Sequence, residues 1–227
     1  MIFKQVFDQK SSTYTYIIAS SIGREALIID PVLENVEDYL KILRNLELKL
    51  VKVIDTHIHA DHITGASKLK DKTKCVTIMG NHTPTDAVEI KVEDNEIIKL
   101  DQIKIKALYT PGHTSDSFSF LMDNYLFSGD TLLINGTGRT DFQNGNAKDA
   151  YDSIFSRLLR LPDETLLYPA HDYKGEKVST IGKEKKFNPR LQVRNVDEYV
   201  EIMNNLNLKK PSAIDYNIAC NLKLGNI

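Results

Sequence analysis

The sequence of 227 residues lacks several features that define particular classes of protein. It contains only two cysteines, Cys75 and Cys220, so we expect no disulfide framework, and a reducing cytoplasm is the expected compartment. No apolar run approaches the roughly 20 residues that span a bilayer. The N-terminus has no apolar segment typical of a secretory signal. These absences predict a protein that is neither secreted nor embedded in a membrane.

The chain also lacks any excess of one charge. Its 29 Lys and Arg residues oppose 31 Asp and Glu residues, which gives a formal net charge of -2. The charged residues form no basic field and no long tail of one sign. We therefore expect no nucleic acid partner.

The length and the pattern fit one domain over residues 1–227, because no repeat, low-complexity segment or long linker divides the chain. Strand-like segments come first, helical and strand-like segments then alternate, and helical segments follow. This order predicts sheets sandwiched by helices. The expected strands are residues 2–7, 14–19, 25–30, 50–54, 75–79, 103–108, 117–122, 125–127 and 165–168, and the expected helices are residues 35–46, 63–70, 147–161 and 196–206.

The most distinctive stretch is Thr56-His57-Ile58-His59-Ala60-Asp61-His62, directly after a strand-like run. In an extended chain, side chains two residues apart point to the same side, so His57 and His59 can converge on one point. If a helix then begins, Asp61 and His62 face a second point nearby. Imidazole and carboxylate together suit zinc, iron or manganese. A solvated loop of histidines is the alternative interpretation.

Three further residues of the metal-binding type occur where strands end in turns. His113 follows Pro-Gly, Asp130 follows Ser-Gly, and His171 follows Pro-Ala. Proline stops strand pairing and glycine permits a sharp turn, so each side chain is aimed away from its sheet edge. Taken alone, each has a structural alternative, such as a turn aspartate. His82 has no such setting, and we interpret it as a surface turn histidine.

The segment Gly136-Thr137-Gly138-Arg139-Thr140-Asp141-Phe142 places an arginine beside glycines. Its guanidinium has the geometry to bind a carboxylate through two parallel hydrogen bonds. An ordinary glycine loop with a solvated arginine fits the pattern equally well.

The ordered histidines and aspartates resemble the metallo-β-lactamase fold superfamily, from about Ile28 to His171. The resemblance implies an α/β fold, the αββα sandwich of two mixed sheets flanked by helices, with the metal at one sheet edge. Both metal positions of the superfamily can be supplied, so the metal count stays open. The first position would use His57, His59, His113 and Asp130, and the second Asp61, His62, His171 and a bridging Asp130.

Within that superfamily, nearly the whole chain is similar to the persulfide dioxygenases. The similar blocks are Ser128–Leu133, Gly138–Gln143, Tyr168–Tyr173, Asn188–Leu191 and Asn204–Pro211. The resemblance implies one Fe(II) per chain, held by His57, His113 and Asp130 as the catalytic residues. His59, Asp61, His62 and His171 would form a hydrogen-bonded outer shell. That family usually has a cysteine-glycine pair near its end, where this chain has Leu224-Gly225.

The same resemblance implies oxidation of glutathione persulfide by O2 and water to sulfite and glutathione, as part of sulfide detoxification. Two histidines and one carboxylate on one face of iron leave positions for substrate, oxygen and water. Arg139 would hold a glutathione carboxylate and Tyr173 would line the same groove. Arg190 is a weaker candidate for substrate binding, with a structural ion pair as its alternative. A homodimer is compatible with this interpretation.

Two other functions fit the residues. The first is hydrolysis of a glutathione thioester of the glyoxalase II type, in which two metals share Asp130 and a bridging hydroxide. The second is a non-catalytic metal or redox binding protein on the same scaffold. Metal count and oxygen uptake separate the first from the dioxygenase. Full metal loading without turnover would favour the second.

Overall fold

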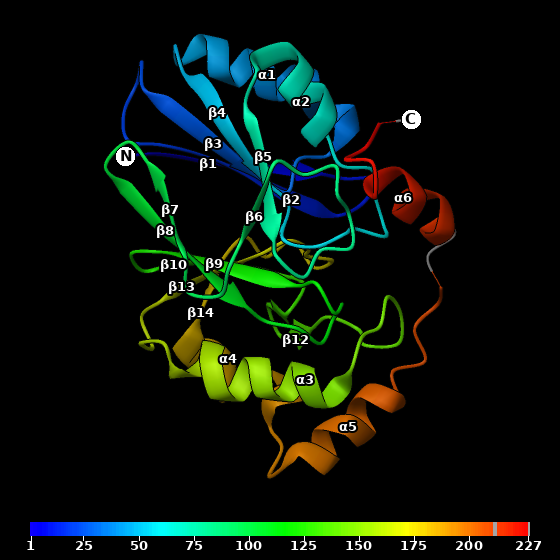
Figure 1. Ribbon diagram of the computed structural model, residues 1–227. Helices are drawn as coiled ribbons and strands as arrows, with labels where there is room; N and C mark the ends of the chain where they lie inside the picture. The colour runs from blue at the N-terminus through cyan, green and yellow to red at the C-terminus, as the bar shows by residue number, and fades with distance from the viewer. Residues whose placement is uncertain (211–212, 227) are drawn as a thin grey trace.

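The structure is a computed structural model that describes residues 1–210 and 213–226. Two six-stranded sheets pack face to face, and helices cover the outer face of each (Figure 1). Both sheets contain parallel and antiparallel pairs, so the predicted αββα sandwich of mixed sheets is confirmed. Among the described residues, no helix is long and apolar enough to cross a membrane. Pro211, the end of the last similar sequence block, lies outside the described residues.

The first sheet has the strand order β1-β2-β3-β4-β5-β6, antiparallel from β1 to β3 and parallel from β3 to β6. Helices α1 and α2 lie on its outer face (Figure 1). The strands are β1 (Ile2–Asp8), β2 (Thr13–Ala19), β3 (Glu25–Ile29), β4 (Lys49–Ile54), β5 (Val76–Gly80) and β6 (Ile90–Val92), and the helices are η1 (Leu33–Asn35), α1 (Val36–Asn45) and α2 (Ala66–Thr73).

The second sheet has the order β14-β13-β10-β9-β8-β7, with β10 and β13 parallel. Its strands are β7 (Ile97–Leu100), β8 (Ile103–Tyr109), β9 (Phe118–Met122), β10 (Tyr125–Gly129), β13 (Leu166–Pro169) and β14 (Ser179–Thr180). A small hairpin joins β11 (Leu132–Leu133) to β12 (Gly136–Thr137). The remaining helices are α3 (Ala147–Asp152), η2 (Ser153–Arg157), η3 (Leu158–Arg160), α4 (Ile181–Phe187), η4 (Pro189–Leu191), α5 (Val196–Asn204) and α6 (Ile214–Asn221).

The helix predicted over residues 147–161 forms a continuous helical path that is not α-helical throughout. Asn146 caps it, because its side-chain oxygen accepts hydrogen bonds from the backbone of Lys148 and Asp149. After Asp152 the path widens into the π turn η2 and then tightens into the 3-10 turn η3. Asn195 caps α5 in the same way, as predicted.

The core has one layer between the sheets and one beneath the helices of each sheet. β2 is buried on both faces. Alternate residues of a strand point to opposite sides, and each side of β2 packs against a layer of the core. Tyr14, Tyr16 and Ile18 pack between the sheets, and Ile17 and Ala19 pack against α1 and its neighbours. The strand is therefore buried along its whole length, with Thr13 and Thr15 among its apolar and aromatic residues.

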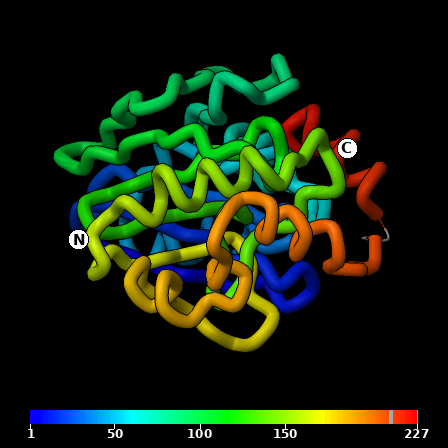
Figure 2. Tube along the Cα trace, turned by 90° about the horizontal axis from the view of Figure 1, so that it is seen from below, coloured from blue at the N-terminus to red at the C-terminus, as the bar shows by residue number. Residues whose placement is uncertain are grey.

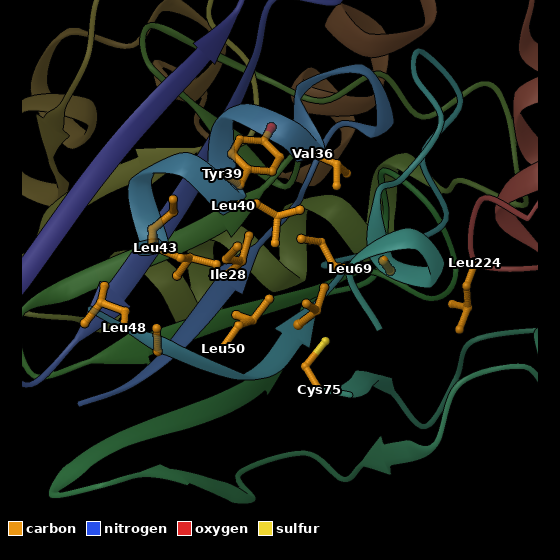
Figure 3. Packing of buried hydrophobic residues seen from close by; sticks show 14 of the residues in the cluster. Ile28, Val36, Tyr39, Leu40, Leu43, Leu48, Leu50, Leu69, Cys75 and Leu224 are labelled. Carbon is orange, nitrogen blue, oxygen red and sulfur yellow. The ribbon is translucent and has the colours of Figure 1, made fainter. Parts of the chain in front are cut away.

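The layer beneath α1 depends on a helical repeat that is visible in the sequence. Val36, Tyr39, Leu40 and Leu43 are buried and lie three and four residues apart, which places them on one face of the helix. Figure 3 shows this face over Ile28 of β3. Val36, Leu40 and Leu43 were predicted to share a helical face, and the structure confirms it.

One edge of the sandwich gathers the loops that carry the metal-type residues. β10 and β13 run parallel, so the residues that follow them, Asp130 and His171, emerge side by side. The two sheets are tied at this edge because Phe118 donates a backbone hydrogen bond of 2.9 Å to Thr56, and Tyr14 one of 2.7 Å to Ala170. The two ends of the chain lie on opposite sides of the molecule (Figure 2).

Candidate metal centre

His57, His113 and Asp130 meet at the sandwich edge from three separate loops. They follow β4, β8 and β10, and one ligand atom of each lies within 4.8 Å of the others. His57 and His113 are 56 positions apart in the sequence, so their spacing alone did not place them together. The structure therefore brings together the three residues that were predicted to hold iron.

Hydrogen bonds orient both histidines of this trio. Nδ1 of His113 donates to the backbone oxygen of Arg139 at 2.7 Å, and Nδ1 of His57 lies 3.0 Å from Thr56 Oγ1. We assign the proton of each ring to Nδ1, which leaves Nε2 free for a metal. Burial, with the neighbouring His59 and His113, lowers the pKa of His57 well below its usual value. A neutral imidazole is the form that binds a metal.

Thr56 links His57 to a buried carboxylate. Its hydroxyl lies 3.1 Å from Asp30 Oδ2, and its backbone N–H donates to Asp30 Oδ1 at 2.8 Å. Gly129 makes room for this arrangement, because it has a φ of +52° and an added Cβ would lie 2.8 Å from Thr56 Oγ1. Sequence reasoning missed Asp30 and Thr56 as parts of the site. The only signal was an aspartate at the end of a strand before a proline.

His171 lies between two carboxylates. Nδ1 donates to Asp130 Oδ1 at 2.7 Å and Nε2 donates to Asp61 Oδ2 at 2.6 Å. Burial alone would lower the pKa of His171, but Asp130 and Asp61 raise it well above its usual value. A protonated imidazole donates from both nitrogens, which matches this geometry. His171 therefore orients the Asp130 carboxylate.

A second trio, His59, Asp61 and His62, lies beside the first, with one ligand atom of each within 4.8 Å of the others. His59 Nε2 lies 3.1 Å from Asp30 Oδ1. Burial alone would lower the pKa of His59, but Asp30 and Asp55 raise it to about 9. Among the described residues, His59 Nδ1 and His62 Nε2 are buried without a hydrogen-bond partner. His59 also forms a third group of possible ligands with Asp30 and Asp55. His82 is exposed, with its ring tilted against that of Tyr109, and belongs to none of the three groups.

The C-terminal helix α6 holds the histidine loop from the outside. The side chain of Asn221 donates to the backbone oxygens of His59 and His62, both at 2.8 Å, and accepts from the backbone N–H of Thr64 at 2.9 Å. Asn217 donates to the oxygen of Ala60 at 2.9 Å. Both asparagines are buried. Sequence reasoning missed them, because they lie about 160 residues from the loop that they hold.

A cavity of about 500 Å³ opens beside His113, Asp130 and His171. Arg139, Tyr173 and Arg190, the three predicted substrate-binding residues, all line it. The ring of Tyr173 lies nearly parallel to that of His171, with centroids 6.0 Å apart, and its side chain is exposed at the rim. Lys174 and Lys209 add two more cations to the wall.

The two arginines of the cavity have different partners. Arg139 forms a two-point ion pair with Asp141, at 2.6 and 2.7 Å. Arg190 donates to the backbone oxygen of Thr137, and among the described residues no carboxylate lies within ion-pair distance of it. Burial lowers the pKa of Arg190. The ion pair that was the structural alternative for Arg190 is thus absent from the described part of the chain.

The αββα sandwich and the histidine-aspartate cluster at its edge define a member of the metallo-β-lactamase superfamily, whose family model matches residues 9–171. Within it, the chain belongs to the persulfide dioxygenase family. It is 39% identical to human mitochondrial persulfide dioxygenase ETHE1, over 99% of this chain and 89% of that protein. The crystal structure of ETHE1 from Myxococcus xanthus superposes with a TM-score of 0.97 at 45% identity, covering 100% of both chains.

A relative with another named activity is less similar. The probable hydroxyacylglutathione hydrolase of Schizosaccharomyces pombe is 31% identical, over 87% of this chain and 88% of that protein. The predicted family is therefore confirmed, and the named hydrolase lies further away in sequence.

Proposed function

We propose that this protein oxidises glutathione persulfide with O2 and water to sulfite and glutathione at one Fe(II), and so removes products of sulfide metabolism. The observation that carries the proposal is the trio of His57, His113 and Asp130, of which His113 and Asp130 line a cavity that is also lined with cations. The full-length similarity to persulfide dioxygenases supports the same reaction.

The donor set fits Fe(II). Two neutral imidazoles and one carboxylate are the ligands of the facial triad in non-haem iron oxygenases. When bound, Fe(II) would supply adjacent open positions at which a persulfide sulfur and O2 can react. His57 and His113 would be held for this purpose by Thr56 and by the backbone of Arg139. Asp130 would be held by His171.

The contacts of His171 connect the two groups of possible ligands. Its Nδ1 lies 2.7 Å from Asp130 Oδ1 and its Nε2 lies 2.6 Å from Asp61 Oδ2, so one ring reaches both carboxylates. Its proton on Nδ1 keeps Asp130 Oδ1 occupied and leaves Oδ2 for the metal, 3.5 Å from His113 Nε2. We propose that His59, Asp61, His62 and His171 act as this supporting network.

The cavity supports binding of a carboxylate-bearing thiol such as glutathione. Arg190 is half-buried with no carboxylate partner in the described residues, so an arriving carboxylate would find its guanidinium available. We propose that Arg190 and the ring of Tyr173 contact the glutathione moiety while the persulfide sulfur points to His113 and Asp130. Arg139 borders the same cavity, but its guanidinium is already paired with Asp141.

Thioester hydrolysis of the glyoxalase II type remains the second candidate, because one observation favours it. His59 Nδ1 and His62 Nε2 are buried and unpartnered, and once His59 releases its extra proton they offer, with Asp61, donor atoms for a second ion. In that mechanism two metals activate a hydroxide that attacks a thioester carbonyl.

Metal analysis with oxygen uptake tests the proposal. The protein is purified without oxygen, its metals are counted, and oxygen consumption is followed with glutathione persulfide and with S-lactoylglutathione. About one iron per chain and rapid uptake with the persulfide are expected. Two metals per chain, no uptake and hydrolysis of S-lactoylglutathione would transfer the assignment to the hydrolase.

The compartment and the assembly stay predictions. The human relative is named as mitochondrial. For this chain we propose a cytoplasmic location and a homodimer, which cell fractionation and the mass of the native protein in solution would test.

A further inference from the structure

The guanidinium of Arg139 has nearly all of its donors occupied. Nε and Nη2 donate to the two carboxylate oxygens of Asp141 at 2.6 and 2.7 Å. Nη2 also donates to the backbone oxygen of Leu208 at 3.2 Å, and Nη1 donates to that of Lys209 at 2.8 Å. An arginine has five N–H donors, so one remains. A two-point bond to a substrate carboxylate needs two parallel donors and is not available here.

The backbone that Arg139 holds is the connection between α5 and α6. We call residues 206–210 the strap; in Figure 1 it leaves α5 at the lower right and rises toward α6. Leu208 and Lys209 of the strap line the active-site cavity, so the strap forms part of its wall.

The strap has few other attachments. Among the described residues, its remaining hydrogen bonds are local, reaching only Met203, Asn205 and Asp215. Leu206, at the start of the strap, packs against the hydrophobic core, and Lys210 Nζ lies 6.0 Å from the centre of the Phe142 ring. Leu208, in the middle of the strap, is 47% exposed. The two bonds from Arg139 are therefore the hydrogen bonds that hold Leu208 and Lys209 to the body of the protein.

Asp141 and Phe142 hold the arginine in the required orientation. The Asp141 carboxylate fixes the plane of the guanidinium, and the Arg139 Cζ atom lies 4.5 Å from the centre of the Phe142 ring. Asp141 itself is absent from the residues that line the active-site cavity. Asp141 and Phe142 thus hold Arg139 in place, and Arg139 in turn holds the backbone of Leu208 and Lys209.

We infer that Arg139 is a positioning residue, which with Asp141 latches the strap against the cavity and thereby places Leu208 and Lys209 against bound substrate. Its effect on substrate is indirect, in contrast to the direct contact that the resemblance implies. The inference rests on the proposed function for the identity of the substrate, but the attachment of the strap by Arg139 does not depend on that function.

Asp141→Asn separates the latch from direct substrate binding. If Arg139 and Asp141 hold the strap, this variant weakens the attachment of Arg139, loosens the strap and raises KM. If Arg139 bound a substrate carboxylate directly, removal of the competing Asp141 charge would leave KM unchanged or lower it. Arg139→Lys is the second variant, because lysine keeps the charge but lacks the planar set of donors. Asp152→Asn, an exposed aspartate of α3, is the matched control.

The strap carries its own reporter, the Lys209–Lys210 bond, which an endoproteinase specific for lysine can cleave. Such cleavage requires local opening of the segment. We expect the Lys209–Lys210 bond to be cleaved about tenfold faster in Asp141→Asn and Arg139→Lys than in wild type. This factor corresponds to the loss of roughly one charge-assisted hydrogen bond. KM for glutathione persulfide should rise by a similar factor, with kcat, iron content and melting temperature close to wild type. Asp152→Asn should match wild type in every measurement.

Unchanged cleavage in both variants, or a KM in Asp141→Asn at or below that of wild type, would overturn the latch. If the wild-type protein consumes no oxygen with glutathione persulfide, the proposed function fails, while the cleavage rates still decide whether Arg139 holds the strap.

Discussion

At the scale of single residues, the site depends on groups that never touch a metal. Asp30 holds the backbone and hydroxyl of Thr56, and Thr56 in turn accepts from His57. This chain fixes which nitrogen of His57 carries the proton, and therefore which one carries a lone pair. A histidine that was free to rotate or to change tautomer would spend part of its time with no lone pair directed at the metal.

Replacement of Thr56 by valine tests this chain. Valine keeps the shape of threonine but removes the hydroxyl, so His57 Nδ1 and Asp30 Oδ2 both lose a partner. We expect iron affinity to fall about 10- to 100-fold, as is typical when a group behind a metal ligand is removed. Competition with a calibrated chelator measures it. Thr56→Ser, which keeps the hydroxyl, should bind iron nearly as wild type does; equal affinity in both variants would contradict the role of the hydroxyl.

At the scale of elements, α6 shows how a short helix can act far from its position in the sequence. Its inward face carries Asn217 and Asn221, one turn apart, and they bond to the loop between β4 and α2. The sequence did not predict this helix, because the face that packs mixes Ile214 and Cys220 with the two asparagines and leaves no continuous apolar stripe of helical period. α1 was predictable for the opposite reason, since its buried face is apolar.

Asn221→Ala should loosen the histidine loop. The backbone oxygens of His59 and His62 would lose their partner in a buried place, at a cost of about 1 to 3 kcal/mol each. We expect a lower free energy of unfolding in urea and weaker iron binding together. Lys223→Ala, an exposed change just after α6, is the control and should alter neither. A loss of stability with iron affinity intact would limit α6 to a general structural role.

At the scale of the whole molecule, the metal centre joins the two halves of the sandwich. His57 comes from the first sheet, and His113 and Asp130 come from the second. An ion bound by all three stabilises only the folded chain, because the unfolded chain does not bring these residues together.

Fe(II) added without oxygen to the metal-free protein should therefore raise its melting temperature. The expected stabilisation is about 2.7 kcal/mol when free iron is 100 times its dissociation constant. Calorimetry or circular dichroism follows the transition. Asp130→Ala lacks the carboxylate of the trio and should show little or no rise. An equal rise in both proteins would mean that iron binds elsewhere.

The sequence by itself determined the ligand types, their order along the chain and the alternation of strands and helices, since these follow from residue chemistry and local period. It predicted the buried strand β2 and the capped helix α5 correctly. It did not predict contacts between residues that become neighbours only when the two sheets pack. The tertiary structure alone decided that Asp30 stands behind His57, that α6 holds the histidine loop, and that Arg139 binds the backbone of Leu208 and Lys209. Each depends on contacts whose geometry is set by the packing of distant segments, which no local pattern encodes.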